Sequence, residues 1–260
     1  NQNTMTEVTA RDEVSALARG IALLRAVADA GQPLSNKDLA ESTGIPKPTV
    51  SRLTATLLAG GLLRQAADER FSLGAAALYL GNAYLATFDF RQQARLHLAE
   101  LADASGAHVH LGVRDGLDIL MIDTLRPKSA LILSRVDVGS RMSIATSASG
   151  RAYLSALAPA PQQALLDDLR AGSGPAWGEL EGRLAAARQA YAREGFCTSF
   201  GEWHPDINAL GFTLCGPRGE LYAVSVGGPA YKLTPALLRE KVAPRLLRAK
   251  EAVDREVGLA

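Results

Sequence analysis

The chain has 260 residues, of which 47% are hydrophobic and 21% are charged, a balance that excludes a disordered chain, a collagen and a coiled-coil rod. The length exceeds what one core usually supports, so we expect two domains. The formal net charge of +1 at pH 7 excludes a protein that binds nucleic acid over its whole surface, so contact with DNA must be confined to a local positive patch.

The sequence gives no sign of a membrane or secreted protein. Its apolar runs are far shorter than the ~20 residues that span a bilayer, and the polar first residues carry no signal-peptide core. We therefore expect a cytoplasmic protein without a membrane partner. Cys197 and Cys215 are too few for a disulfide scaffold or a cysteine-based zinc finger. The chain does not begin with Met, so residues 1–10 are left out of the fold prediction.

Apolar residues recur at helical spacing before residue 106. One face of a first helix is predicted at Val14, Leu17, Ile21, Leu24 and Val27. A second helix begins at Ser35, a good N-cap with Asp38 three residues later, and it ends at Gly44. A third helix starts around Pro48 and runs to Gly60.

Two short strand-like runs follow at 62–65 and 70–73, joined by a polar hairpin loop. Three helices and a hairpin form the order of a winged helix-turn-helix. Ala40, Gly44 and Val50 supply the small residue, the turn and the buried β-branched residue that such a unit needs. The sequence therefore predicts a DNA-binding unit, and the alternative is a helical packing module that binds nothing.

The start of the third helix carries the candidate DNA contacts. At about 3.6 residues per turn, Val50, Leu53 and Leu57 point inward. The N-terminal end of a recognition helix enters the major groove, where Arg52 could bond a guanine edge. Between Glu41 and Asp68 there are three basic residues and no acidic one. We predict DNA contacts by Ser35, Lys47, Pro48, Thr49, Ser51, Arg52, Ala55 and, at the wing, Arg70. Each could instead be an ordinary solvated surface residue.

We predict a winged helix-turn-helix domain at 11–74, a linker helix at 75–90 and an effector-binding and oligomerisation domain at 91–260. The leucines of two helical stretches, from Gly74 to Phe88 and from Arg91 to Ser105, suit packing onto the second domain and dimerisation. The second domain mixes strands and helices, so the fold class is α+β. Its expected elements are strands at 108–113, 117–123, 131–136, 209–215 and 220–226, and helices from Arg151, at 179–194 and at 235–257.

No catalytic motif is present. No Ser, His and Asp are ordered as a recognisable triad, and a phosphate loop and a dinucleotide fingerprint are absent. His108 and His110 share a strand face, and His204, Asp206 and Cys197 could in principle complete a metal site, but the spacing matches no known ligand set. We expect no enzyme activity, no metal and no cofactor.

A ligand pocket is better supported. Residues 147–150 precede a helix, so backbone N–H groups there could hold a carboxylate. The alternative is a simple N-cap by Ser147 or Ser149.

The chain resembles the IclR family of bacterial transcriptional regulators from about Ser15 to Gly258. In the N-terminal part the resemblance rests on RGIALL (19–24), LAESTGIPKPTVSRL (39–53) and FSLG (71–74). In the C-terminal part it rests on TSASGRAYL (146–154), GFC (195–197) with Glu202, and VSVGGP (224–229).

The resemblance implies a winged-helix domain, a linker helix and a GAF-like effector domain that assemble as a dimer or tetramer. Family members bind promoter DNA, often as repressors, and respond to small metabolites, commonly organic or aromatic acids. By position, the family's effector pocket corresponds to Ala148, Ser149, Gly150, Ser199, Ala209, Ser225 and Gly227. To these we add Ser147 from the helix start, and Glu202 and His204 from the unusual segment EWHPD (202–206), where Trp203 could also stack on a ring.

This chain has Ser199 and Ala209 where some members have acidic or cysteine residues. We therefore expect a DNA-binding regulator, with repression the expected sign, that responds to a small organic acid. Four alternatives stay open: an activator, a regulator whose second domain only oligomerises, a small-molecule enzyme with an appended winged helix, and an interaction module that has lost DNA binding.

Overall fold

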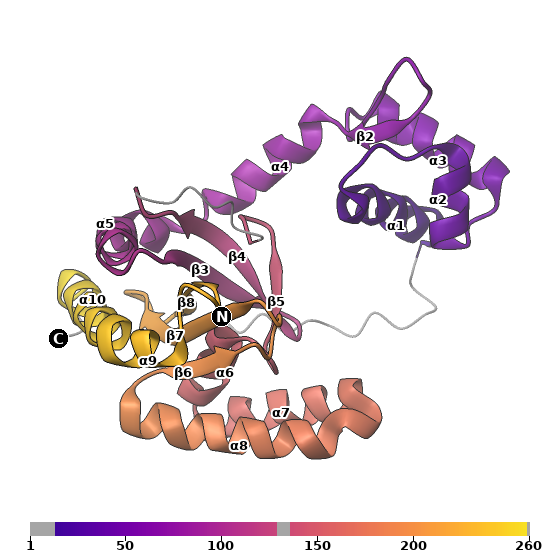
Figure 1. The fold of residues 1–260 in the computed structure, drawn as a ribbon. Helices are drawn as coiled ribbons and strands as arrows, with labels where there is room; N and C mark the ends of the chain where they lie inside the picture. Colours follow the sequence, from indigo (N-terminus) through magenta and orange to yellow (C-terminus); the bar gives the residue numbers. More distant parts are fainter. Residues whose placement is uncertain (1–13, 129–135, 259–260) are drawn as a thin grey trace. The chain divides into compact units, whose positions relative to one another are not determined.

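The computed structural model describes residues 14–128 and 136–258, and its internal contacts divide the chain into two compact units after Thr87 (Figure 1). This division falls inside the segment 75–90 that we expected to be a linker. No helix among the described residues is long and apolar enough to cross a membrane. Each unit has its own core.

The N-terminal unit has the predicted order of three helices and a hairpin. Its elements are α1 (Ser15–Ala30), α2 (Asn36–Thr43), α3 (Lys47–Ala59), β1 (Leu63–Gln65), β2 (Phe71–Leu73) and α4 (Ala75–Leu85). The cap at Ser35 is confirmed, because its hydroxyl accepts a hydrogen bond from the Asp38 N–H and the Asp38 carboxylate accepts one from the Ser35 N–H. Gly44 ends α2 with φ of 69°, a left-handed conformation that favours glycine.

The core of this unit confirms Val27 on the predicted face of α1, with Leu24 partly buried against that core, but not the rest of the face. Gly20, Leu23 and Val27 are the buried residues of α1, whereas Val14, Leu17 and Ile21 are exposed. The buried face is rotated because α1 packs against both α2 and α3, and periodicity alone does not tell which of two adjacent apolar stripes meets them. The core is formed by Leu23, Val27, Leu39, Ile45, Val50, Leu63 and Phe71.

A six-stranded antiparallel sheet forms the centre of the C-terminal unit, in the order β5-β4-β3-β8-β7-β6. Its strands are β3 (His108–Asp115), β4 (Asp118–Leu125), β5 (Arg141–Ser143), β6 (Cys197–Phe200), β7 (Ile207–Cys215) and β8 (Leu221–Pro229). The helices are α5 (Asp89–Ser105), α6 (Ala148–Ala156), α7 (Pro159–Ser173), α8 (Trp177–Glu194), α9 (Pro235–Leu237) and α10 (Ala243–Glu256). A 3-10 turn at Gly174–Ala176 precedes α8.

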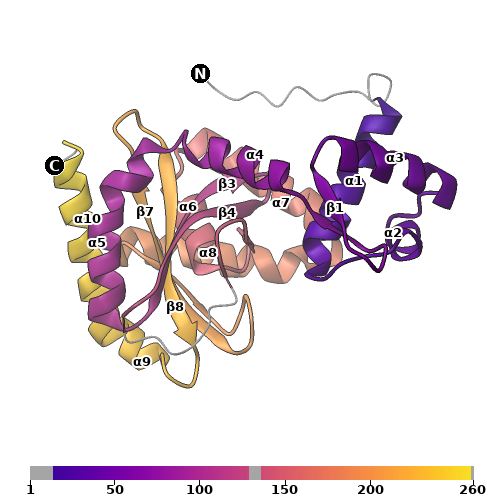
Figure 2. The ribbon, with the colours of Figure 1, turned by 90° about the horizontal axis from the view of Figure 1, so that it is seen from above.

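Helices cover both faces of this sheet. Figures 1 and 2 show α5 beside α10 on one face, and α6 with α7 and α8 on the other. On the α6 face, Ile119, Met121, Ile144, Leu154 and Leu165 belong to one buried cluster. The unit is therefore an α+β structure, and the predicted fold class is confirmed.

Several predicted elements differ from the structure. The predicted strand 131–136 falls, except for Val136, outside the described residues, and Val136 is in no strand. The helix expected from Arg151 begins at Ala148, because Ser147 caps it. Helix α7 and strands β5 and β6 were not predicted. The expected final helix is continued from α9 to α10 by a π-helical turn at Leu238–Val242.

The start of α6 lies directly on β7. A Cβ added to Gly211 would lie 2.1 Å from the backbone carbonyl of Ala148, so only glycine permits this approach. Any side chain at position 211 would push α6 away from the sheet. Gly211 therefore fixes where the start of α6 sits above the sheet.

We predict that Gly211→Ala lowers the free energy of unfolding of the C-terminal unit by at least about 1–3 kcal/mol, the usual cost of overpacking. Both tryptophans of the chain, Trp177 and Trp203, are in this unit, so urea unfolding followed by tryptophan fluorescence reports on it alone. The control is Gly182→Ala on α8, where a Cβ would meet nothing within 4 Å. It should be neutral or stabilising by up to about 1 kcal/mol.

Candidate functional site

The surface of α3 has the predicted distribution of side chains. Lys47, Pro48, Ser51, Arg52 and Ala55 are exposed and Thr49 is partly buried, whereas Val50 is fully buried. Thr54 is also buried, and its hydroxyl donates to the Val50 carbonyl. Among residues 14–128 and 136–258, no ion pair involves Lys47, Arg52 or Arg64. No carboxylate among the described residues therefore neutralises these three charges.

Ser35 and Arg70 are already engaged within the unit. The Ser35 hydroxyl donates to Asp38 at 2.9 Å. Arg70 donates to the Pro33 carbonyl at 3.2 Å and forms ion pairs with Asp38 at 3.4 Å and Asp68 at 3.6 Å. The hydrogen bonds from Ser35, and then the Arg70 charge, hold the pKa of Asp38 below its ordinary value. These contacts join the wing to the start of α2.

In the C-terminal unit, one row of residues crosses four strands. His108 of β3 is opposite Gly227 of β8, Gly227 is opposite Ala209 of β7, and Ala209 is opposite Ser199 of β6. A parallel row joins His110, Ser225 and Gly211. Because these side chains are small in the middle of the sheet, the face is hollow there.

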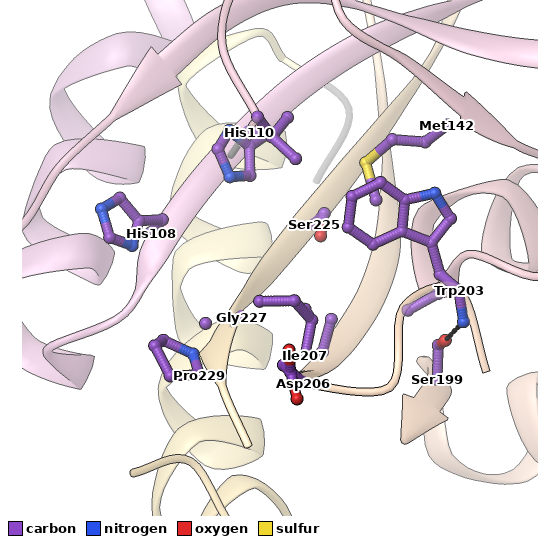
Figure 3. A pocket seen from close by; sticks show the side chains of 14 residues that line it. His108, His110, Met142, Ser199, Trp203, Asp206, Ile207, Ser225, Gly227 and Pro229 are labelled. Atoms are coloured by element: carbon purple, nitrogen blue, oxygen red, sulfur yellow. Dashed lines mark hydrogen bonds between the residues drawn. The ribbon is translucent and has the colours of Figure 1, made fainter. Parts of the chain in front are cut away.

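A cavity of about 200 Å³ occupies this hollow (Figure 3). Its floor is the row from His108 to Ser199, and Ala148 of α6 forms one wall. Apolar side chains dominate the other walls, and in Figure 3 the Trp203 indole lies across the cavity from the two histidines. The remaining lining residues are His110, Val136, Met142, Trp203, Asp206, Ile207, Ser225, Gly228 and Pro229.

Five of the residues predicted to bind an effector do line the cavity, and five do not. The lining ones are Ala148, Ser199, Ala209, Ser225 and Gly227. Ser199 uses its hydroxyl to donate to the Thr146 carbonyl and to accept from the Trp203 N–H, so it positions the walls. The two histidines were considered only as metal ligands, and no group of residues that could hold a metal exists among the described ones.

The predicted residues outside the cavity wall have structural contacts instead. Ser147 caps α6 by accepting from the Gly150 N–H at 3.1 Å, and Gly150 lets α6 approach Ile144 closely. The Ser149 hydroxyl is buried without a hydrogen bond to any described residue. His204 accepts from the Asp206 N–H at 3.2 Å. The cap by Ser147 is the alternative that the sequence offered, and it is confirmed. The close approach at Gly150 was not predicted, because it depends on how α6 meets the sheet.

Glu202 forms an ion pair that joins two walls of the cavity. Its carboxylate accepts two hydrogen bonds of 2.7 Å from Arg151, whose side chain is only 4% exposed. Arg151 also donates to the carbonyls of Ala145 and Thr198. Burial raises the pKa of Glu202, but the hydrogen bonds and charge of Arg151 outweigh it, so the pKa lies below its ordinary value. The pair holds the segment that carries Trp203 against the start of α6.

Comparisons with known proteins agree with this two-unit structure. The model of the IclR helix-turn-helix domain matches residues 16–67, and that of the bacterial transcriptional regulator IclR C-terminal domain matches residues 82–255. The chain belongs to the IclR family. It is therefore a DNA-binding transcriptional regulator from a family of regulators and not of enzymes.

Individual family members cover nearly the whole chain. The HTH-type transcriptional regulator TsaQ1/TsaQ2 of Comamonas testosteroni is 30% identical and is matched over 95% of this chain and 90% of its own. The structure of an IclR-family regulator from Brucella abortus is 32% identical, with a TM-score of 0.77 over 95% of this chain and 94% of that one. An IclR homologue of Microbacterium hydrocarbonoxydans, solved with 4-hydroxybenzoate, shares the fold at 19% identity, with a TM-score of 0.75 over 94% and 100% of the two chains.

We predict that Glu202→Gln lowers the free energy of unfolding of the C-terminal unit by up to about 3 kcal/mol, because Arg151 is left buried without its counter-charge. Glu202 has a lowered pKa when folded, so its stabilisation is present above its ordinary pKa of 4.5 and is lost as the pH falls through the folded-state value. The difference between wild type and variant should therefore shrink in acid. Urea unfolding at several pH values measures it.

The control for that measurement is Glu181→Gln, which breaks the exposed Arg170–Glu181 pair. Exposed pairs contribute about 0–1 kcal/mol. Equal losses in both variants would contradict a special role for the Arg151–Glu202 pair.

Proposed function

We propose that this regulator is a repressor whose binding to double-stranded promoter DNA is modulated by a small organic acid, with aromatic acids the favoured class. The observation that carries the proposal is the cavity above the sheet, which is lined by apolar walls and a few polar groups. Its volume is below the roughly 300–1,000 Å³ of pockets for drug-sized ligands, so it suits a small metabolite. The bound 4-hydroxybenzoate of the Microbacterium homologue supports an aromatic acid.

The DNA-binding surface in this proposal is the exposed start of α3. Lys47 and Arg52 supply positive charge without ion pairs among the described residues, and Thr49 and Ser51 supply hydroxyl groups for phosphates or bases. Pro48 and Ala55 form the apolar part of the same surface. Ser35 and Arg70 contribute through the start of α2 and the wing, where Arg70 would exchange Asp38 for a phosphate.

The assembly in this proposal is a dimer or a tetramer. Helix α4 is mostly apolar, yet none of its residues is buried. Leu78, Tyr79 and Leu80 are 68%, 73% and 56% exposed. A helix that is apolar all round is normally covered. We propose that α4, inside the linker 75–90, pairs with a second copy, so that the winged helices of residues 11–74 meet two half-sites while the 91–260 domain binds the effector.

Coupling follows from the position of the cavity. An effector that contacts the start of α6 and the Trp203 segment binds one arrangement of these walls better than others. The reciprocal consequence is a changed affinity of the paired winged helices for DNA.

We expect that Arg52→Ala weakens binding to the promoter region next to the protein's own gene by about 5- to 150-fold, since a bidentate base contact contributes roughly 1–3 kcal/mol. Fluorescence anisotropy at two salt concentrations measures this, and organic acids added to the same complex test its release. Arg218→Ala, at a mostly exposed arginine in the β7–β8 turn, is the charge-matched control and should bind as wild type does. Unchanged binding by Arg52→Ala would contradict the proposed DNA surface.

For the assembly, the double variant Leu78→Glu/Tyr79→Glu should shift the protein to monomer, because two charges would be buried in the proposed contact. Size-exclusion chromatography with light scattering gives the mass. Tyr231→Glu, at a tyrosine of the C-terminal unit that is 80% exposed, is the control. A double variant with the wild-type mass would rule out α4 as the contact.

A further inference from the structure

Two histidines face the cavity, and none of the lining residues that the structure describes is a lysine or an arginine. His108 and His110 are 6% and 5% exposed, and their rings stack nearly parallel with centroids 6.3 Å apart (Figure 3). The register places His108 opposite Gly227, and His110 opposite Ser225 on one side and Thr124 on the other. Both imidazoles therefore border the space that a ligand would occupy.

The surroundings keep His110 neutral in the absence of an anion. Burial and then the neighbouring His108 lower the pKa of His110 to about 4. Asp137 acts in the opposite direction and Arg126 adds to the lowering, and these two side chains form an ion pair at 2.9 Å. Asp206 supplies a carboxylate, and not a cation, among the lining residues, and its side chain is 77% exposed. A ligand anion therefore meets no fixed cation among these described groups.

We propose that an organic anion enters this cavity together with one proton, which the His108–His110 pair takes up from solvent. The inference rests on the proposed function, because it requires the cavity to be the effector site. An unpaired charge is costly in a buried site, and an anion within about 4–6 Å of an imidazole favours its protonated form. The pair takes one proton and not two, because two stacked imidazolium ions would repel each other. No covalent bond of the ligand changes, and the proton returns to solvent on release.

Linked protonation fixes the sign of the pH dependence. Between the pKa of the free pair and the higher pKa of the anion-bound pair, affinity falls by up to about tenfold for each unit of rising pH. Above the bound-state pKa the affinity becomes independent of pH. A neutral ligand of the same shape shows no such dependence. The pH dependence of the affinity therefore differs between an acid and its amide.

Isothermal titration calorimetry of the full chain with 4-hydroxybenzoate and the neutral 4-hydroxybenzamide tests this. We expect the Kd of the acid to be about tenfold larger at pH 8 than at pH 5.5, and the Kd of the amide to be unchanged. Buffers of different ionisation enthalpy should give different heats for the acid at pH 5.5. The double variant His108→Gln/His110→Gln should remove the pH dependence, whereas His97→Gln, a control on α5 outside the cavity, should retain it.

The outcomes separate the inference from the proposed function. Binding of the acid with one Kd at both pH values would overturn the inference and leave the effector site standing. A pH dependence that survives in the double variant His108→Gln/His110→Gln would place the proton elsewhere and overturn it too. Binding of neither compound at either pH would overturn the aromatic-acid site and the inference with it.

Discussion

The close approach of α6 to the sheet is the constraint on which the C-terminal unit depends. Because Gly211 has no side chain, the backbone of Ala148 can lie directly on β7. The neighbouring positions Ala209 and Gly227 are also small, so the sheet face beside that contact stays hollow. Small residues on this face of the sheet thus allow the helix to pack closely and also leave space for the cavity. A larger side chain at Gly211 would prevent the helix contact, and one at Ala209 or Gly227 would fill the cavity.

The walls of that cavity are held by polar contacts and not by apolar packing alone. Arg151, one turn into α6, is bound to Glu202 in the segment that carries Trp203. Ser199 adds a second link between the β6 strand and the loop before α6. Buried hydrogen bonds therefore join the two walls, and such bonds tolerate few alternative geometries. In the proposed function, this connection is the route by which effector binding would reach the rest of the unit.

Sequence patterns predicted the winged helix well because its signals are local. The Ser35 cap, the Gly44 turn and the inward face at Val50 each involve residues close together in the chain. The cavity was predicted only in part, since the row from His108 to Ser199 joins four strands whose register no local pattern gives. Glu202 was assigned to the effector from its unusual surroundings, and only the structure shows that it pairs with Arg151.

The most direct test of the account fills the cavity and asks whether control of DNA is lost. Ala209→Leu places a larger side chain in the cavity floor, far along the chain from α3. Anisotropy titrations of wild type and variant with the promoter DNA, with and without a panel of aromatic and aliphatic carboxylic acids, measure affinity and release. The account predicts that wild type and Ala209→Leu bind the DNA with equal affinity in the absence of acid. It predicts that an acid releases only the wild-type protein from the DNA. Equal release of both proteins by the same acid would contradict it.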